Sequence, residues 1–263
     1  MVWNDVCLIH SQAPLVHNIT NYVVMNTTAN ALLAVGASPV MAHALEEVEE
    51  MTALASALVL NIGTLSGPWV EAMVLAGRAA QQKGIPTVLD PVGVGATTFR
   101  TRTAQRLLEE TGPRLIRGNA SEILALANLG GGTKGVDATD PVEGALEAAR
   151  QLSSRCNCVV TVSGPVDLIV QGERLARIHN GDPIMGRITG MGCTATALMG
   201  AFAAVNPDPF RAAVDAMVVL GVAGELAREH SQGPGSFQVA LLDQLASLRQ
   251  EDLERLARIE GLG

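Results

Sequence analysis

Short apolar runs recur along the chain as far as residue 164, and most of them end at or beside Gly, Asn, Asp or Pro. Runs that are apolar on successive residues are typical of strands buried on both faces of a parallel sheet. Segments with helical spacing of apolar residues lie between the runs, for example 66–83 and 141–152. The six runs are residues 15–20, 39–41, 58–63, 87–92, 115–119 and 159–164. We therefore predict an α/β fold with a mostly parallel central sheet and helices on both faces.

The second half of the chain has a different pattern. Residues 166–170 and 174–178, joined by Gln-Gly-Glu, predict a pair of strands. Helical segments are expected at 193–205, about 208–230 and about 237–259. The sequence contains no linker, repeat or low-complexity segment, so residues 1–263 are interpreted as a single domain without a separate lid domain.

The composition excludes several classes of protein. Apolar residues make up 48% of the chain and charged residues 17%, which argues against a disordered protein. The formal net charge of −8 argues against nonspecific binding to nucleic acid or to an anionic membrane. Four cysteines are too few for a disulfide scaffold, and the first residues lack the basic and apolar regions of a signal peptide. We therefore expect a cytoplasmic protein.

The glycine-rich segment Gly190-Met191-Gly192-Cys193 leads directly into a predicted helix of small residues. Glycines let backbone N–H groups approach an anion, and a helix N-terminus adds about half a positive charge. We interpret Gly190 and Gly192 as an anion hole. Cys193 lies in the first helical turn, where its thiol pKa is expected to fall, so it is the candidate base that removes a proton from a hydroxyl attacking a phosphate. The alternative is an ordinary Gly-rich helix start followed by a buried cysteine.

Charged side chains follow two neighbouring predicted strands. Asp90 precedes a Pro-Val-Gly-Val-Gly loop, where it can bind Mg²⁺ or cap its own turn. Arg117 ends the next run, and Asn119 and Glu122 have the spacing of a capping-box variant. A guanidinium and a carboxylate at a strand end also suit phosphate and Mg²⁺. The glycine-rich segment 130–137 is not a Walker A motif, because it lacks the Gly-Lys-Ser/Thr order and follows a helix.

From near residue 14 to about residue 245 the chain resembles the hydroxyethylthiazole kinase family, a thiamine-pathway branch of the ribokinase-like superfamily. The resemblance is carried by PLVHNITN (14–21), GASPVM (36–41), NIGTL (61–65), LDPVGVGA (89–96), IRGNASEI (116–123), GVDAT (135–139), GMGC (190–193) and GPGSF (233–237). It implies a ribokinase-like fold and ATP-dependent phosphorylation of the hydroxyl of 4-methyl-5-(2-hydroxyethyl)thiazole. It also implies Mg²⁺ as cofactor and a homotrimer, with the thiazole site near a subunit boundary.

The same resemblance assigns roles to individual residues. The implied contacts are Met41, Gly190 and Asn21 with the thiazole alcohol, Arg117 and Ser163 with ATP, and Asp90 and Glu122 with Mg²⁺. Cys193 occupies the position where most kinases of the superfamily have an Asp base.

The chain departs from the family pattern at three positions. Ser163 replaces the usual Thr, which conserves the hydroxyl. Pro165 removes a carboxylate and a backbone donor from the turn that follows, and Met191 stands where smaller residues are usual. Three other functions remain as alternatives: a kinase for hydroxymethylpyrimidine or pyridoxal, a nucleotide-dependent hydrate dehydratase, and a non-catalytic regulator that binds nucleotide or thiazole. The first two are expected to carry Asp at position 193.

Overall fold

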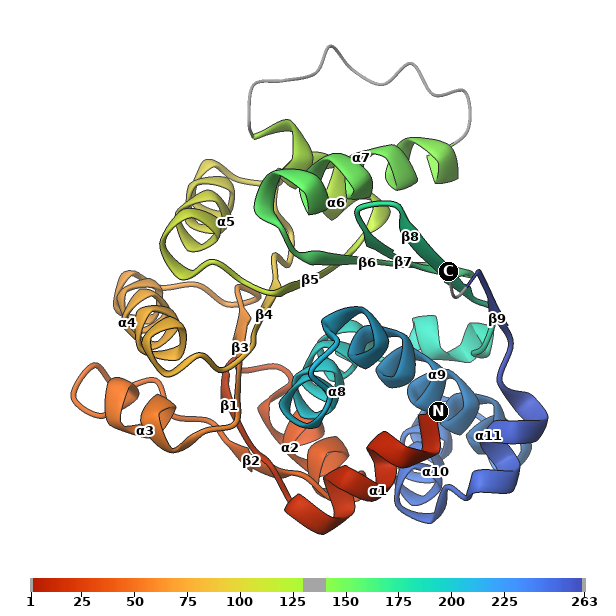
Figure 1. The fold of residues 1–263 in the computed structure, drawn as a ribbon. Helices are drawn as coiled ribbons and strands as arrows, with labels where there is room; N and C mark the ends of the chain where they lie inside the picture. Colours follow the sequence, from red (N-terminus) through yellow and green to blue (C-terminus); the bar gives the residue numbers. More distant parts are fainter. Residues whose placement is uncertain (1, 130–140, 262–263) are drawn as a thin grey trace.

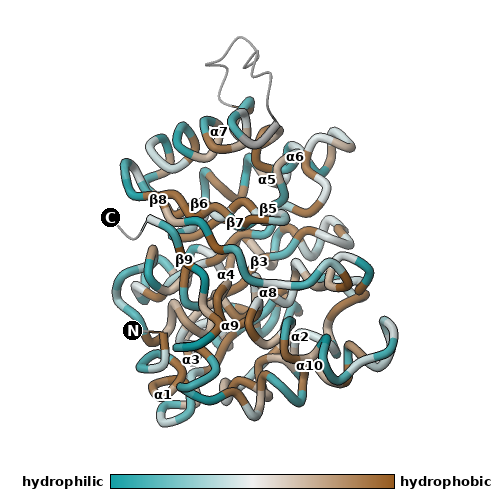
Figure 2. The backbone as a smooth tube through the Cα atoms, turned by 90° about the vertical axis from the view of Figure 1, so that its right-hand side faces the viewer, coloured by the Kyte–Doolittle hydropathy of each residue, from teal (hydrophilic) through white to brown (hydrophobic). Residues whose placement is uncertain are grey.

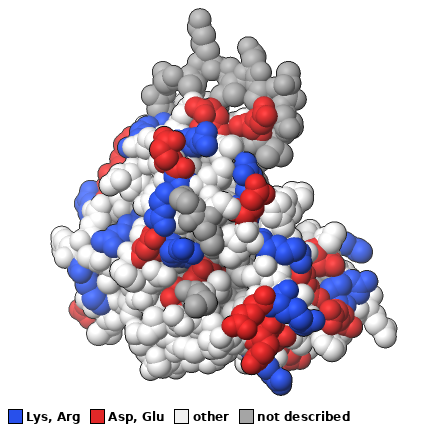
Figure 3. Space-filling model, turned by 45° about the vertical axis from the view of Figure 1, so that its right-hand side comes forward, with Lys and Arg blue, Asp and Glu red and all other residues white. Residues whose placement is uncertain are grey.

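The structure of the chain is a computed structural model that describes residues 2–129 and 141–261 (Figure 1). The glycine-rich segment 130–137 and the GVDAT motif at 135–139 lie outside the described residues. Within the described part of the chain, no helix is long and apolar enough to cross a membrane. On the face that Figure 3 shows, acidic and basic side chains are interspersed.

The described strands form one sheet in the order β2-β1-β3-β4-β5-β6-β7-β8-β9. All neighbours from β2 to β6 are parallel, and β7, β8 and β9 are added as antiparallel strands. The strands are β1 (Leu15–Ile19), β2 (Ser38–Val40), β3 (Ala57–Asn61), β4 (Thr87–Asp90), β5 (Leu115–Asn119), β6 (Val159–Ser163), β7 (Asp167–Gln171), β8 (Arg174–Ile178) and β9 (Ile259–Glu260). The predicted, mostly parallel sheet and the predicted strand pair are therefore confirmed.

Helices cover both faces of this sheet (Figure 1). The first group, on one face, is α3 (Val48–Leu54), α4 (Gly67–Lys83), α5 (Thr98–Thr111), α6 (Ala120–Asn128) and α7 (Pro141–Cys156). The second group, on the other face, is α1 (Val2–Gln12), α2 (Met25–Ala34), α8 (Met191–Val205), α9 (Pro209–Glu229), α10 (Pro234–Ser247) and α11 (Gln250–Leu256). A short 3-10 helix, η1 (Pro183–Arg187), precedes α8.

Alternate residues of each buried strand pack into the two helical layers. In β3, Leu58 and Leu60 join the core formed with α4, whereas Val59 joins the core formed with α8. Side chains in a strand point alternately to opposite faces, so a strand covered on both sides is apolar at most positions, and the buried polar side chains it carries need hydrogen-bond partners. Figure 2 shows the hydrophobic segments gathered in the middle of the molecule. Each fully buried Leu or Val contributes roughly 1.5–3 kcal/mol to folding.

The helix predicted for about residues 237–259 is wrong in its extent. α10 ends at Ser247, and α11 begins at Gln250. Between them Leu248 has extended backbone angles of φ −57° and ψ 134°, and its side chain is buried against the second group of helices. Burial of Leu248 therefore bends the chain, and the residues that follow α11 pair with β8 as β9.

A pair of buried carboxyl groups joins α1 to α9. Asp5 of α1 and Asp215 of α9 are both buried, and Asn206 Nδ2 donates a 2.6 Å hydrogen bond to Asp5 Oδ2. Burial raises the pKa of Asp215, and the charge of the neighbouring Asp5 raises it further. Between the usual Asp pKa of 3.8 and the native pKa of about 7, the native state therefore holds a proton that the unfolded chain has released. The stability that this pair contributes is present at low pH and is lost as the pH rises through the raised native pKa.

We expect Asp215→Asn to reduce the fall in the free energy of unfolding between about pH 5 and about pH 8 by roughly 1–3 kcal/mol. The amide can still donate to Asp5, and it has no proton to release. Urea unfolding at the two pH values measures the effect, with the exposed Asp243→Asn as the control. An unchanged pH dependence in Asp215→Asn would contradict the assignment.

Candidate functional site

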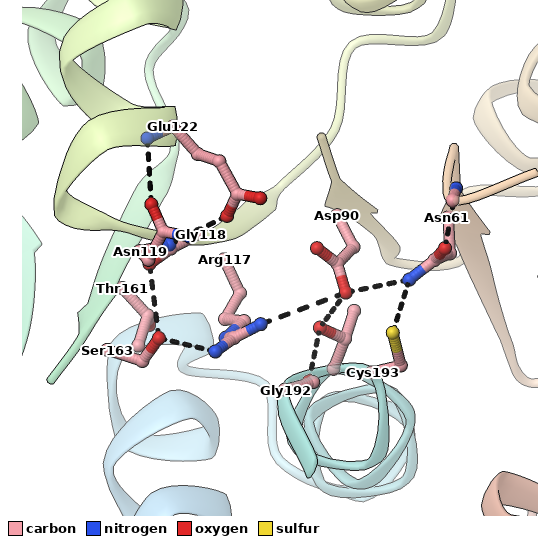
Figure 4. Close-up of polar contacts among 12 residues, drawn as sticks. Asn61, Asp90, Arg117, Gly118, Asn119, Glu122, Thr161, Ser163, Gly192 and Cys193 are labelled. Atoms are coloured by element: carbon pink, nitrogen blue, oxygen red, sulfur yellow. Dashed lines mark hydrogen bonds and ion pairs between the residues drawn. The ribbon is translucent and has the colours of Figure 1, made fainter. Parts of the chain in front are cut away.

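Polar side chains from four parallel strands meet at the carboxyl edge of the sheet, next to the start of α8 (Figure 4). Asn61 ends β3, Asp90 ends β4, Arg117 lies in β5 and Ser163 ends β6. The crevice at this edge is where open α/β sheets bind ligands, because the loops that follow the strands converge there. All four side chains therefore lie at or near the carboxyl ends of their strands.

The Asp90 carboxylate lies at the centre of this group and is completely buried. Its Oδ2 accepts hydrogen bonds of 2.8 Å from Asn61 Nδ2 and from Thr196 Oγ1, and Arg117 Nη1 lies 3.9 Å away. Burial raises the pKa of Asp90 to about 6, although the charge of Arg117 opposes the rise. Its second oxygen, Oδ1, has no hydrogen-bond partner among the described residues. A buried carboxylate oxygen without a partner is an open position for a cation or a bound water.

Cys193 lies at the start of α8, as predicted, but its acidity is not as predicted. Its Sγ accepts from Asn61 Nδ2 at 3.2 Å and from Asn21 Nδ2 at 3.5 Å. Burial and the charge of Asp90 raise the pKa of the Cys193 thiol. The expectation of a lowered pKa was wrong, because the helix terminus supplies only a partial charge, whereas burial and a full negative charge both favour the neutral thiol.

Arg117 and Ser163, the residues predicted to contact ATP, lie side by side. Arg117 Nη2 donates to Ser163 Oγ. Both line a cavity of about 500 Å³, whose wall also includes Gly164, Met191 and Gly192. Residues 180–183, before and at the start of η1, and residues of α9 also line the cavity. A cavity of this volume with a cation on its wall can accept a phosphorylated ligand of nucleotide size.

The glycine loop fits closely around its neighbours. Gly190 caps the start of α8 with φ of 80°, and a Cβ at this position would overlap Val24. A Cβ at Gly192 would overlap the guanidinium of Arg117. Close packing therefore favours glycine at both positions, whether or not they form the predicted anion hole.

Glu122 forms the capping box that its spacing suggested. Asn119 Oδ1 accepts from Glu122 N, and Glu122 Oε2 accepts from Asn119 N, both at 2.9 Å. Its other oxygen, Oε1, accepts from Gly93 N at 2.9 Å. Glu122 thus ties the loop after β4 to the start of α6. The described residues contain no group of three or more His, Cys, Asp or Glu side chains that could hold a metal.

Arg100 of α5 holds the loops that follow β3 and β4. Its Nη1 donates to Ile62 O at 2.7 Å and to Val92 O at 2.6 Å, and its Nη2 donates to Gly63 O at 2.7 Å. These carbonyls lie one or two residues after Asn61 and Asp90 in the sequence. The charge-assisted bonds therefore fix the two loops relative to each other.

Two of the residues predicted to contact the alcohol, Asn21 and Met41, have surroundings that differ from each other. Asn21 is buried against Cys193 and Asn61. Met41 follows the edge strand β2, is half-buried, and is not among the residues that line the cavity beside Arg117.

Three residues of the site were missed by sequence analysis. Asn61 was part of a recognised motif, but a lone Asn after a strand is usually read as a turn residue. Thr196 lies three residues after Cys193, a spacing that places both on one side of a helix. Asp167 lines the cavity and accepts from Gly164 N at 3.0 Å, and burial raises its pKa to about 6. The turn that contains Pro165 is therefore followed directly by an acid that lines the cavity.

Comparisons with known proteins agree with this geometry. The family model described as "Hydroxyethylthiazole kinase family" matches residues 6–251. A hydroxyethylthiazole kinase of Syntrophus aciditrophicus is 57% identical over 258 residues, which cover 98% of this chain and 96% of that protein. The structure of a hydroxyethylthiazole kinase protein from Pyrococcus horikoshii OT3 superposes with a TM-score of 0.93 at 44% identity, covering 100% of this chain and 99% of that one.

A more distant structure shows the fold alone. The pyridoxal kinase of Staphylococcus aureus in complex with ADP has a TM-score of 0.62 at 14% identity, over 81% of this chain and 88% of that one. Together with the Pyrococcus structure, it confirms the ribokinase-like fold predicted from the sequence.

We expect Gly192→Ala to weaken nucleotide binding roughly tenfold while the fold is kept. The added Cβ overlaps the end of a flexible side chain, so Arg117 moves away from Ser163 and Asp90 and the backbone is not forced to shift. Calorimetric titration with ATP measures the affinity, and thermal unfolding measures the fold. Gly67→Ala, where nothing lies within 4 Å of the added atom, is the matched control. Unchanged affinity in Gly192→Ala would show that the position of Arg117 is not critical.

Proposed function

This chain belongs to the hydroxyethylthiazole kinase family, and we propose that it transfers the γ-phosphoryl group of ATP to the hydroxyl of 4-methyl-5-(2-hydroxyethyl)thiazole, releasing ADP. This reaction would serve thiamine biosynthesis or salvage. The observation that carries the proposal is the position of Cys193, at the start of α8, and of Asp90, at the end of β4, next to the cavity that Arg117 and Ser163 line.

The nucleotide would bind in this cavity with its phosphates toward α8. Arg117 supplies a cation, and the start of α8 supplies backbone N–H groups and the positive end of the helix dipole. These groups are in place before the reaction, so they can stabilise charge on the transferring phosphoryl group without reorganising. Ser163 holds the guanidinium of Arg117 toward the cavity through the hydrogen bond to its Oγ.

The alcohol would bind beside Cys193, with Asn21, Gly190 and Met41 as its other proposed contacts. Attack on the γ-phosphorus forms the new O–P bond as the bond to the ADP oxygen breaks, and the alcohol proton leaves to the Cys193 sulfur when that sulfur is a thiolate. A loose phosphoryl-transfer transition state needs little help from a base. Cys193 therefore acts mainly by positioning the hydroxyl and takes the proton late in the reaction.

Mg²⁺ is proposed as the cofactor, and one side chain fits it well. The buried, unpartnered Oδ1 of Asp90 is an oxygen ligand of the kind that Mg²⁺ prefers, reached directly or through a water. Glu122 has both oxygens engaged with backbone N–H groups, so its proposed role is to hold the Gly93 loop near the ion. When bound with ATP, Mg²⁺ would neutralise charge on the β- and γ-phosphate oxygens.

A homotrimer with the thiazole site near a subunit boundary is also proposed. Tyr22 and Val23 follow directly on Asn21, and they are 66% and 62% exposed. Exposed apolar side chains beside a proposed substrate residue are what a subunit boundary at this place would cover. The cytoplasmic location and the absence of nucleic-acid and membrane partners stay predictions.

The first experiment measures ADP release by the purified protein with ATP, Mg²⁺ and one alcohol at a time. The panel is the hydroxyethylthiazole, hydroxymethylpyrimidine, pyridoxal and ribose. We expect release that depends on the thiazole and that stops when EDTA removes the metal. Faster release with hydroxymethylpyrimidine or pyridoxal would favour the related vitamin-precursor kinases. Thiazole binding without ADP release would indicate a binding protein.

The role of Cys193 is tested by Cys193→Ser. Because the pKa of this thiol is raised, the thiolate fraction, and with it the turnover number of the wild type, should grow as the pH rises above neutrality. We expect Cys193→Ser to lower kcat by roughly ten- to a hundredfold and to lose this rise, because a hydroxyl is not deprotonated in the same range. The measurement is kcat against pH for both proteins. Full turnover with an unchanged pH profile in Cys193→Ser would exclude the base role.

A further inference from the structure

We propose that Asn61 is a positioning residue, whose side-chain amide holds the Cys193 sulfur as a hydrogen-bond acceptor beside Asp90. The catalytic consequence of this role rests on the function proposed above, but the geometry does not. Asn61 is 1% exposed, and it lies between the carboxylate and the thiol that the mechanism uses (Figure 4).

The orientation of the Asn61 amide is determined by its neighbours. Its Oδ1 accepts a 2.9 Å hydrogen bond from Gly63 N and a 2.8 Å hydrogen bond from Asn21 Nδ2. A backbone N–H can only donate, so the atom that faces Gly63 must be the oxygen. The two hydrogens of Asn61 Nδ2 consequently point in the opposite direction, toward α8.

Both of these hydrogens have an acceptor. Asn61 Nδ2 donates to Asp90 Oδ2 at 2.8 Å and to Cys193 Sγ at 3.2 Å. An ionised carboxylate can only accept, which fixes this side of the amide independently of Gly63. The Asn61 side chain therefore has two donors and two acceptors engaged, and rotating the amide by half a turn would break all four contacts.

This arrangement determines what the sulfur can do. Cys193 Sγ receives N–H groups from both Asn61 and Asn21, so its lone pairs on that side are occupied. Its own proton, or the proton it receives, must lie on the remaining side of the sulfur. The amide also separates two electron-rich groups, the Asp90 carboxylate and the sulfur, that would otherwise repel each other.

The alternative is a purely structural role for Asn61. Its bond with Gly63 also shapes the loop after β3, and a variant could lose activity only because that loop moves. Arg100 holds the same loop through the carbonyls of Ile62 and Gly63. The loop therefore has a support that does not depend on Asn61, and a test must read out the state of Cys193 itself.

The test compares Asn61→Asp with the wild type. The substitution keeps the shape of the side chain and replaces both N–H donors by an oxygen. We expect kcat to fall roughly a hundredfold while the KM values for ATP and thiazole change less than about threefold. In a Cys193→Ala background the factor by which Asn61→Asp lowers kcat should be at least about tenfold smaller. The reason is that one of the two acceptors of the Asn61 amide, the Cys193 sulfur, has been removed.

A second readout does not need kinase activity. Mass spectrometry follows the rate at which iodoacetamide alkylates Cys193 at a fixed pH. We expect roughly tenfold slower alkylation in Asn61→Asp, because the donor that stabilises a reacting sulfur is lost and a negative oxygen takes its place. Asn61→Gln, which keeps the amide, should recover part of the rate. The exposed Asn4→Asp on α1 should behave as the wild type.

The proposal requires both the smaller kcat penalty in the Cys193→Ala background and the slower alkylation. Equal penalties in the two backgrounds, or an unchanged rate of alkylation in a folded Asn61→Asp protein, would overturn it. If Asn61→Asp does not fold, Asn61→Gln decides by the same two readouts, with smaller effects of the same sign. A wild-type protein that releases no ADP would refute the proposed function, and alkylation would then decide the positioning role alone.

Discussion

The buried carboxylate at the end of β4 determines how the polar side chains around it are arranged. Asp90 is completely buried, and a charge in such a position is stable only if donors surround it. Those donors come from three other parts of the chain: Asn61 at the end of β3, Thr196 on α8 and Arg117 on β5. The hydrogen bonds and the ion pair to Asp90 therefore connect β3, β5 and α8 to the end of β4.

The geometry around Asp90 explains why the neighbouring positions have little freedom. Arg117 reaches toward Asp90 only because Gly192 has no side chain in its path. The loop after β4 is held from two sides, by Arg100 through Val92 O and by Glu122 through Gly93 N. The site is therefore a set of short loops whose backbones are tied to each other by charged side chains. Such pre-organisation suits a reaction in which the protein contributes mainly position and electrostatics.

Sequence analysis located the sheet and most of the site because both depend on local patterns. Apolar runs that end at polar residues identified the strands, and the residues at their ends, Asp90 and Arg117, were recognised with them. Asn61 and Thr196 were missed because their importance comes from a partner far away in the sequence. The pKa of Cys193 was predicted from its position at a helix N-terminus alone. Burial and the charge of Asp90, about one hundred residues earlier in the sequence, determine the direction in which it shifts. The break between α10 and α11 at Leu248 was missed for the same reason, because Leu248 is buried in a core formed by residues far away in the sequence.

The contact between α1 and the later helices affects the order in which the chain can fold during synthesis. Asp5 hydrogen-bonds Asn206, and Val6 and Ile9 of α1 are buried in the core that includes α8 and α9. Because α1 precedes α8 and α9 in the chain, its apolar face lacks these partners until α8, which ends at Val205, and α9, which ends at Glu229, have been synthesised. The parallel strands and the helices of the opposite face can associate earlier. α1 can thus complete its packing only after helices that are synthesised much later than itself.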